Sequence, residues 1–205
     1  MVTVRNFLKL THGSIYRLLL PIIVRPPMIW YKGGVYTVTR VAIMRFLDSW
    51  RNRIQGKVLD VGVGTWIYPR QLLGDVSEYT ATDCFEHPNV DVISDIHRLS
   101  EVFQPESFDF VLCTDVLEHV PRPWQAVCQL AGVLKPDGIL LLTTPFNFHI
   151  HRNQNTKDYW RLSADGLRVL LGECAGFAQI DITPIGHPEY PFCHTVVAKK
   201  SSSEL

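Results

Sequence analysis

The sequence lacks several features that would place a chain in a specialised class. Its five cysteines are odd in number, scattered and never spaced as CxxC, which argues against a disulfide framework or a zinc site. The longest apolar run near the start, residues 18–24, is far shorter than the roughly 20 residues that cross a bilayer. No small-residue cleavage site follows it, so we do not expect a signal peptide. These absences favour a cytoplasmic globular protein.

An excess of charge of one sign is also lacking, since 20 Lys and Arg balance 20 Asp and Glu. The balance is uneven along the chain: residues 1–57 hold ten Lys and Arg but a single acid, Asp48. The remainder is correspondingly acidic. This asymmetry indicates either an anionic partner for the N-terminal part or docking of that part on the acidic remainder.

Apolar periodicity predicts a helix over residues 37–54, and from Lys57 onward short apolar runs alternate with helical patterns. Such alternation predicts an α/β fold with a Rossmann-like, doubly wound and mostly parallel sheet. The last two strands have no helix between them, so the last of seven strands is expected to be antiparallel. We expect a basic helical extension or lid over 1–56 and the main domain over 57–200. The expected strands are 57–61, 78–83, 90–94, 107–115, 138–145, 178–185 and 192–200, and the further helices are 67–74, 121–134 and 163–174.

Ligands of such sheets bind at the carboxyl ends of the strands, so the residues that follow each strand are candidates. A GxG pair, Gly62 and Gly64, follows the first strand, although alone it is equally typical of a tight turn. Asp83 and Asp95 follow the next two strands, where Asp83 could instead cap a helix and Asp95 could be a first-turn residue stabilised by the helix dipole. The third glycine of a dinucleotide-binding loop is missing, because Ile67 stands there, which argues against an NAD-dependent oxidoreductase.

Several segments together resemble class I S-adenosylmethionine-dependent methyltransferases, of the branch related to ubiquinone and menaquinone biosynthesis. These segments are "VLDVGVGT", "ATD", "SDI", "SFDFVLCTDVLEHVPRP" and "LAGVLKPDGILLLTTP", and the resemblance covers about Lys57 to Lys199. The later stretch "TPFNFHIHRNQNTKDYWRLSADGL" resembles a bacterial subgroup associated with cell-surface glycans or secondary metabolism. The resemblance implies an enzyme with S-adenosyl-L-methionine as cofactor, so the glycine loop would hold its methionine and ribose, not a pyrophosphate.

The resemblance also implies the cofactor contacts, carried over by position. The loop after the first strand would line the amino-acid end, Asp83 would accept the ribose hydroxyls, and Asp95 with the Ile96 backbone would contact adenine. The end of the fourth strand would lie near the methionine amino group and sulfonium. Glu118 and His119 follow there, and His119 could equally be a structural cap. The cofactor-binding candidates are Asp60, Gly62, Gly64, Asp83, Asp95, Ile96, Thr114, Asp115 and His119.

Two residues depart from the family pattern. Trp66 stands where many members carry a small residue, which could reshape the cofactor pocket. Asp137 replaces the usual glycine before Gly138, a change that a turn tolerates.

The loop after the fifth strand is rich in histidine and aromatic residues and is the candidate acceptor side. His149 and His151 would face the same way on an extended strand, a spacing that metal ligands share. No third ligand is evident, so we expect no metal. One imidazole is a candidate general base for an acceptor hydroxyl, and Tyr159 is a further catalytic candidate. The alternative is that these histidines only pack in a lid.

The preferred interpretation is methyl transfer to a small molecule, with oxygen as the acceptor atom because of the histidines and the lack of a "PPY" amine-binding motif. A carbon or nitrogen acceptor, and a cofactor-binding regulatory or scaffolding protein without transfer, stay open. A nucleic-acid partner is not expected, because the main domain is acidic. The apolar, basic residues 1–35 predict a lid over the acceptor pocket or a peripheral membrane contact. The oligomeric state is left open.

Overall fold

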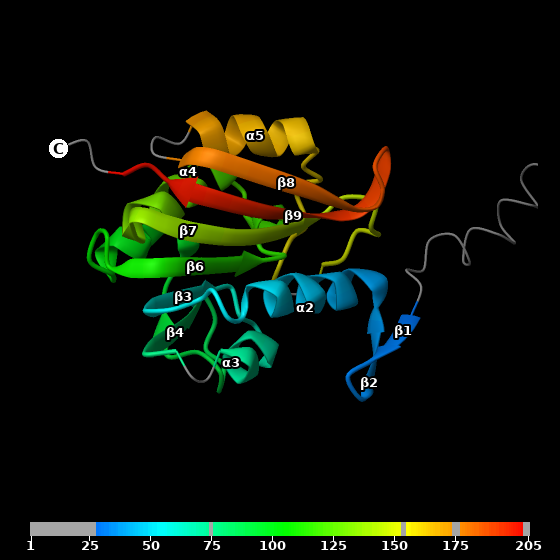
Figure 1. Cartoon of the computed structure of the whole chain (residues 1–205), viewed down its shortest axis with the longest axis horizontal. Coiled ribbons are helices and arrows are strands. Elements are labelled where there is room, and N and C mark those ends of the chain that lie inside the picture. Colours follow the sequence, from blue (N-terminus) through cyan, green and yellow to red (C-terminus); the bar gives the residue numbers. More distant parts are fainter. Residues whose placement is uncertain (1–27, 74–75, 153–154, 174–176, 203–205) are drawn as a thin grey trace, which may run out of the picture.

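The computed structural model describes residues 28–73, 76–152, 155–173 and 177–202 (Figure 1). The elements in chain order are β1 (Met28–Tyr31), β2 (Gly34–Thr37), α2 (Val38–Trp50), β3 (Lys57–Val61), α3 (Tyr68–Leu72), β4 (Glu78–Asp83), β5 (Val92–Ile93), η1 (Ile96–Glu101), β6 (Phe108–Thr114), η2 (Leu117–His119), α4 (Pro123–Val133), β7 (Leu134–Pro145), α5 (Ala164–Glu173), β8 (Phe177–His187) and β9 (Tyr190–Lys200). None of the helices among these residues is long and apolar enough to cross a membrane.

The main sheet has seven strands in the order β5-β4-β3-β6-β7-β9-β8. Strands β5 to β7 pair in parallel, whereas β9 runs antiparallel to both β7 and β8. This confirms the predicted fold class. The chain moves outward from β3 to β5 and then returns to β6 on the other side of β3. The loops after β3 and β6 therefore lie at the switch point of the sheet, where α/β folds bind ligands.

Alternate residues along the central strands point into two cores, one on each face of the sheet. On one face, Val111 and Cys113 of β6 pack with α4 and α5. On the other face, Phe110 and Leu112 of β6 pack with α2 and α3. Figure 1 shows α2 in front of the sheet, with α4 behind it and α5 beside β8. Because helices cover both faces, the central strands are apolar on both sides.

Part of the expected helical extension is a hairpin instead. Strands β1 and β2 pair antiparallel through Lys32 and Gly33, which have φ of 45° and 80°. Two consecutive positive φ values are typical of the type I′ turn that favours hairpins, and the flanking β-branched and aromatic residues suit strands. The helix predicted over 37–54 is present as α2, with Thr37 accepting a hydrogen bond from the Arg40 amide at its start. The boundary at residue 57 stays a prediction, and residues 1–27 lie outside the described part.

The remaining elements lie where the sequence predicts them, with differences at their ends. Strands β3 and β4 match the predicted residues, and Ser163 caps α5 by accepting the Gly166 amide hydrogen. The edge strand β5 is shorter than predicted. Strand β7 begins at Leu134, four residues before the predicted start at Gly138. Asp137 takes a φ of 64°, and the pairing of β7 with β6 continues past it after an irregularity in register. The departure at Asp137 is thus accommodated within the strand.

Candidate active site

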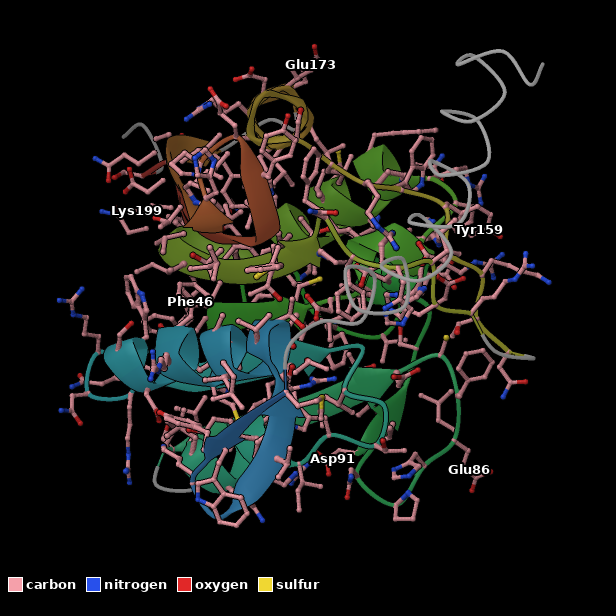
Figure 2. All side chains as sticks on the ribbon, turned by 90° about the vertical axis from the view of Figure 1, so that its right-hand side faces the viewer. Phe46, Glu86, Asp91, Tyr159, Glu173 and Lys199 are labelled. Carbon is pink, nitrogen blue, oxygen red and sulfur yellow. The ribbon has the colours of Figure 1, made fainter. Side chains whose placement is uncertain are left out.

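A cavity of about 1150 Å³ opens at the carboxyl ends of the parallel strands. Single-ligand pockets are usually 300–1,000 Å³, so this cavity has room for a cofactor together with a small acceptor. Its lining comes from the loops after β3, β4, β5, β6 and β7, from the β1–β2 hairpin and from the start of α2. In Figure 2, Tyr159 and Glu86 mark two of these loops on the same side of the molecule.

The glycine loop after β3 needs its two glycines for different reasons. Both have positive φ, 76° at Gly62 and 50° at Gly64. A Cβ on Gly62 would lie 2.4 Å from the Val116 Cγ2 atom, so this glycine lets the loops after β3 and β6 approach each other. A Cβ on Gly64 would meet no atom within 4 Å, so the backbone there faces open space in the cavity. That space fits the close approach of a cofactor to the backbone.

The carboxylate of Asp83 links the loops after β3 and β4. It accepts hydrogen bonds from the Gly64 amide at 2.9 Å and from the Phe85 amide at 3.1 Å. Asp83 also lines the cavity, and a carboxylate has acceptor sites beyond these two. The residue is therefore held in place and can still accept hydroxyl groups of a ligand.

Asp95 is both a helix cap and a cavity residue. Its carboxylate accepts from the His97 amide at 2.9 Å and from the His97 Nδ1 at 2.7 Å. Burial tends to raise its pKa, but these hydrogen bonds are stronger together and lower the pKa of Asp95. The neighbouring Ile96 is buried in the core and also borders the cavity. Asp95 therefore precedes η1 and caps it, whereas the alternative placed it in the first turn, and its position at the cavity still permits contact with a ligand.

Asp60 does not reach the cavity in this structure. Its side chain is 1% exposed and accepts a hydrogen bond from the Tyr79 hydroxyl beneath the glycine loop. Burial raises the pKa of Asp60 to about 7. Strand alternation explains the placement, because Asp60 shares its face of the sheet with Val58 and the α3 side. Its contact with the cofactor stays a prediction, while in this structure its side chain lies in the core on the α3 side of the sheet.

The end of β6 brings Thr114 and Asp115 to the cavity wall. Asp115 has a φ of 53°, a conformation that is costly for a residue with a Cβ and that clusters at functional sites. Its carboxylate accepts from the Thr143 hydroxyl at 2.8 Å, and its amide donates to the Thr143 carbonyl at 3.0 Å. Burial raises the pKa of Asp115, whereas the Thr143 hydrogen bond and the Arg40 charge oppose the rise.

Arg40, at the start of α2, is a cavity residue that sequence reasoning missed. Its guanidinium lies 4.1 Å from the centre of the Trp66 ring, and its charge favours the ionised forms of Asp115 and Glu118. Burial lowers the pKa of Arg40. Trp66 in turn stacks on Tyr68 with ring centres 5.8 Å apart. The Trp66 ring therefore supports the Arg40 guanidinium at the cavity wall. The periodicity of the sequence does not predict this contact, because the two residues lie on different elements.

Glu118, His119 and His151 form a cluster from two loops that are distant in sequence. The Glu118 Oε1 atom lies 3.7 Å from His119 Nε2 and 3.9 Å from His151 Nε2. Glu118 is 0% exposed, and burial, followed by the nearby Asp115, raises its pKa well above the usual range. Burial lowers the pKa of His151, which favours the neutral imidazole. The structure thus brings His119 and His151 together, with Glu118 as the member that sequence reasoning left without a role.

The other acceptor-side candidates lie at the mouth of the cavity. His149 is exposed, with its ring 4.3 Å from that of Phe148, and it does not join the cluster. Tyr159 is 50% exposed, and its backbone amide donates to the Glu118 carbonyl at 2.7 Å. The Trp160 indole donates to the Val120 carbonyl at 2.8 Å. The loop after β7 is therefore anchored to the loop after β6, which sets the position of His151.

Comparison with known proteins identifies the domain. Residues 59–142 match the family model described as a methyltransferase domain. Ubiquinone biosynthesis O-methyltransferase of Neisseria meningitidis serogroup C (strain 053442) is 28% identical over 151 residues, which cover 65% of this chain and 60% of that protein. The chain therefore spans less than two thirds of the length of this relative.

Solved structures share the fold at low sequence identity. The 1,6-didemethyltoxoflavin-N1-methyltransferase of Burkholderia thailandensis, solved with 1,6-didemethyltoxoflavin and S-adenosylhomocysteine, has a TM-score of 0.62 at 19% identity and covers 78% of this chain and 79% of that chain. The [4+2]-cyclase SpnF has a TM-score of 0.61 at 15% identity, covering 94% and 96%. These likenesses concern the fold. The family match supports the resemblance to methyltransferases, and the neighbour from Burkholderia thailandensis was solved with S-adenosylhomocysteine, the demethylated form of the cofactor that the resemblance implies.

Proposed function

Because residues 59–142 form a methyltransferase domain, we propose that this protein methylates a small molecule and that the accepting atom is an oxygen. The observation that carries the proposal is one cavity with two chemically different ends. One end has the glycine loop with Asp83 and Asp95. The other has the imidazoles of His119 and His151. Such an arrangement suits a cofactor beside an acceptor that must lose a proton.

The residues at the first end fit S-adenosylmethionine. The open space above Gly64 admits the cofactor close to the backbone, and the Asp83 carboxylate would accept the ribose hydroxyls. Asp95 and the Ile96 backbone would contact the adenine, with Thr114 and Asp115 toward the methionine amino group. When bound, the cofactor supplies a methyl group on a positively charged sulfur. The chain contributes position and the exclusion of water.

The residues at the second end would prepare the acceptor hydroxyl. His151 is a candidate general base, since its neutral form is favoured and its Nε2 atom faces Glu118. His149 and Tyr159 border the entrance and would contact the body of the acceptor. The curated relative is named an O-methyltransferase, in agreement with an oxygen acceptor, whereas the structural neighbour from Burkholderia thailandensis acts on nitrogen.

The experiment is mass spectrometry of the purified protein, followed by an activity assay. We expect co-purified S-adenosylmethionine or S-adenosylhomocysteine, and release of S-adenosylhomocysteine when a panel of phenols and sugar alcohols is supplied. A panel of amines of similar size is the matched control for the acceptor atom. The proposal would be refuted if the purified protein neither retains nor binds S-adenosylmethionine or S-adenosylhomocysteine. Turnover of amines alone would refute the oxygen acceptor.

The N-terminal part would act as a lid, with membrane contact as the alternative. Met28, Val35 and Tyr36 of the hairpin border the cavity, which supports the lid. Met28, Trp30 and Val35 are also largely exposed apolar side chains, as a membrane contact would require. Deletion of residues 1–35 should abolish methyl transfer and weaken cofactor binding without eliminating it. Salt-sensitive sedimentation with anionic liposomes that is lost on deletion would instead support the membrane contact.

A further inference from the structure

The cluster of Glu118, His119 and His151 has the composition of a metal site. One ligand atom from each residue lies within 4.8 Å of the other two. Ligand atoms around a first-row divalent cation bind at about 2.0–2.2 Å, so they lie roughly 3–3.5 Å from one another. The Glu118 Oε1 atom is already 3.7 Å and 3.9 Å from the two Nε2 atoms. Small side-chain rotations would therefore close the site around a cation.

The Glu118 carboxylate needs a partner that the described residues do not provide. Both of its oxygens are buried without a hydrogen bond from any group in the part of the chain that the structure describes. Burying a carboxylate without a partner is costly whether it is ionised or protonated, because a protonated carboxyl also needs an acceptor. The distances of 3.7 Å and 3.9 Å to the imidazoles exceed hydrogen-bond length. A cation between the three residues would supply the missing interaction.

The two imidazoles are held in the tautomer that a metal requires. The His119 Nδ1 lies 2.5 Å from the Lys157 carbonyl oxygen, which can only accept, so Nδ1 carries the proton. The His151 Nδ1 lies 3.3 Å from the His149 carbonyl and 3.3 Å from an Asp158 carboxylate oxygen, which are also acceptors. Each Nε2 atom is therefore unprotonated, and each lies within 4 Å of the Glu118 Oε1 atom. Metal-ligating histidines characteristically donate their other N–H to such a carbonyl or carboxylate.

The supporting residues are themselves fixed. The Arg161 guanidinium pairs with Asp158 through two hydrogen bonds, one of them 2.8 Å long, and donates to the His149 carbonyl at 3.1 Å. The Asp158 carboxylate also accepts the His151 backbone amide at 2.8 Å. The loop after β7 thus orients the His151 ring through groups outside the cluster. Outer hydrogen bonds of this kind set the ring orientation before a metal arrives.

We propose that Glu118, His119 and His151 bind one first-row divalent cation, such as Zn²⁺, Mn²⁺ or Co²⁺, at the acceptor end of the cavity. Two imidazoles and one carboxylate select these cations over Mg²⁺ and Ca²⁺, which prefer oxygen ligands. Three protein ligands leave a position open, and His119 and His151 border the cavity. In the cation-loaded protein an acceptor hydroxyl at that position would lose its proton to solvent more easily, and His151 would then act as a ligand in place of the general base named above. This catalytic role rests on the proposed function, whereas cation binding does not.

The test is titration of the untagged full chain, stripped with a chelator, with Zn²⁺ alone and with Co²⁺ alone. We expect one equivalent to bind in calorimetry, and Co²⁺ to give visible absorption bands of a nitrogen- and oxygen-ligated ion. Glu118→Gln, His119→Ala and His151→Ala should each weaken Zn²⁺ binding by about a hundredfold or more. His187→Ala, which removes an exposed histidine far along the chain on β8, should bind like the wild type.

Thermal unfolding with and without Zn²⁺ distinguishes a variant that has lost the metal site from a variant that fails to fold. Zn²⁺ should raise the Tm of the wild type and of His187→Ala but leave Glu118→Gln unshifted, because a ligand stabilises the state that binds it. His151 is half-buried, so His151→Ala tests the site even if a change at the buried Glu118 prevents folding. A wild type that binds no Zn²⁺ or Co²⁺, or variants at all three positions that bind like the wild type, would overturn the proposal.

Activity separates this proposal from the proposed function. If the stripped protein methylates an acceptor at the full rate, the catalytic role of the cation is wrong and the proposed function stands. If the loaded protein binds both Zn²⁺ and S-adenosylmethionine but methylates no acceptor, the proposed function fails and the metal site stands. Restoration of methyl transfer by adding back Zn²⁺ or Mn²⁺, with no restoration in His119→Ala, would support both.

Discussion

The two ends of the cavity differ in how their polar groups are satisfied. At the cofactor end, Asp83 accepts one hydrogen bond from the Gly64 amide of the neighbouring loop and one from Phe85 on its own loop, and Asp95 accepts two from His97. At the acceptor end, Glu118 is buried with both oxygens unpartnered among the described residues. The two carboxylates of the first end are therefore held in place by hydrogen bonds that need no ligand. The second is incomplete, which is why we assign it a charged ligand.

The ends also differ in how the chain builds them. The cofactor end uses short loops directly after strands, so each residue follows from the end of one strand. The acceptor end joins Glu118 and His119 to His151, which lies on a separate loop beyond β7. A change in one end should therefore leave the other largely intact. Substitutions at each end, and in the glycine loop between strand β3 and the cavity, test how the two ends are built.

The largest effect is expected at Gly62. In Gly62→Ala the new Cβ would clash with Val116 at a positive φ, so we expect a loss of about 2–4 kcal/mol in the free energy of unfolding. Urea denaturation measures this loss. Gly64→Ala is the matched control, because it shares the positive φ but meets open space, and it should lose only about 1–2 kcal/mol. Equal losses in the two variants would show that the contact between the loops after β3 and β6 contributes little.

The next effect concerns the acceptor end alone. His151→Ala should lower turnover by about a hundredfold or more, as loss of either a base or a metal ligand would. Its affinity for S-adenosylmethionine should change little, which single-turnover kinetics and calorimetry can separate. His149→Ala, on the same loop but outside the cluster, should reduce turnover by less than about tenfold. Equal reductions in turnover in the two variants would contradict the inference that His151 takes part in catalysis and His149 only lines the mouth of the cavity.

Asp83→Ala tests the cofactor end alone. Loss of hydrogen bonds to a charged group should weaken S-adenosylmethionine binding by about 1.5–3 kcal/mol, roughly 10- to 150-fold. Calorimetry measures the affinity, and NAD serves as a ligand that should not bind. Cation binding at Glu118 should be unchanged in this variant. An unchanged affinity for S-adenosylmethionine would remove Asp83 from the site, and tight NAD binding would refute the assignment of the cofactor.

The smallest effect is a pH dependence from Asp60, beneath the glycine loop. Burial raises its pKa to about 7 from 3.8, so the folded protein binds a proton more tightly than the unfolded chain. The stability that this proton contributes is present below pH 4 and is lost as the pH rises to about 7. Wild type should therefore lose roughly 1–2 kcal/mol relative to Asp60→Asn between pH 6 and pH 8. Parallel denaturation profiles of the two proteins would show that Asp60 is ionised throughout.

Much of the fold could be predicted because its signals are local. The apolar runs 57–61 and 78–83 are strands β3 and β4, and the absence of a helix between the last two strands predicts their antiparallel pairing. The hairpin before α2 was missed, because the turn at Lys32 and Gly33 carries less signal than the surrounding apolar and basic residues. The start of β7 was also missed, since the turn at Asp137 reads as a strand boundary.

The candidate site also has a part that the sequence predicts and a part that depends on tertiary packing. The sequence by itself determined the residues after each strand, because parallel strands must place their carboxyl ends at one edge of the sheet. Only the tertiary structure decided that Asp60 is buried away from the cavity, that Arg40 lies over Trp66, and that His151 meets His119. Periodicity specifies the face on which a residue lies, but the distance between two loops depends on how the whole chain packs. The unpartnered carboxylate of Glu118 is a property of that packing.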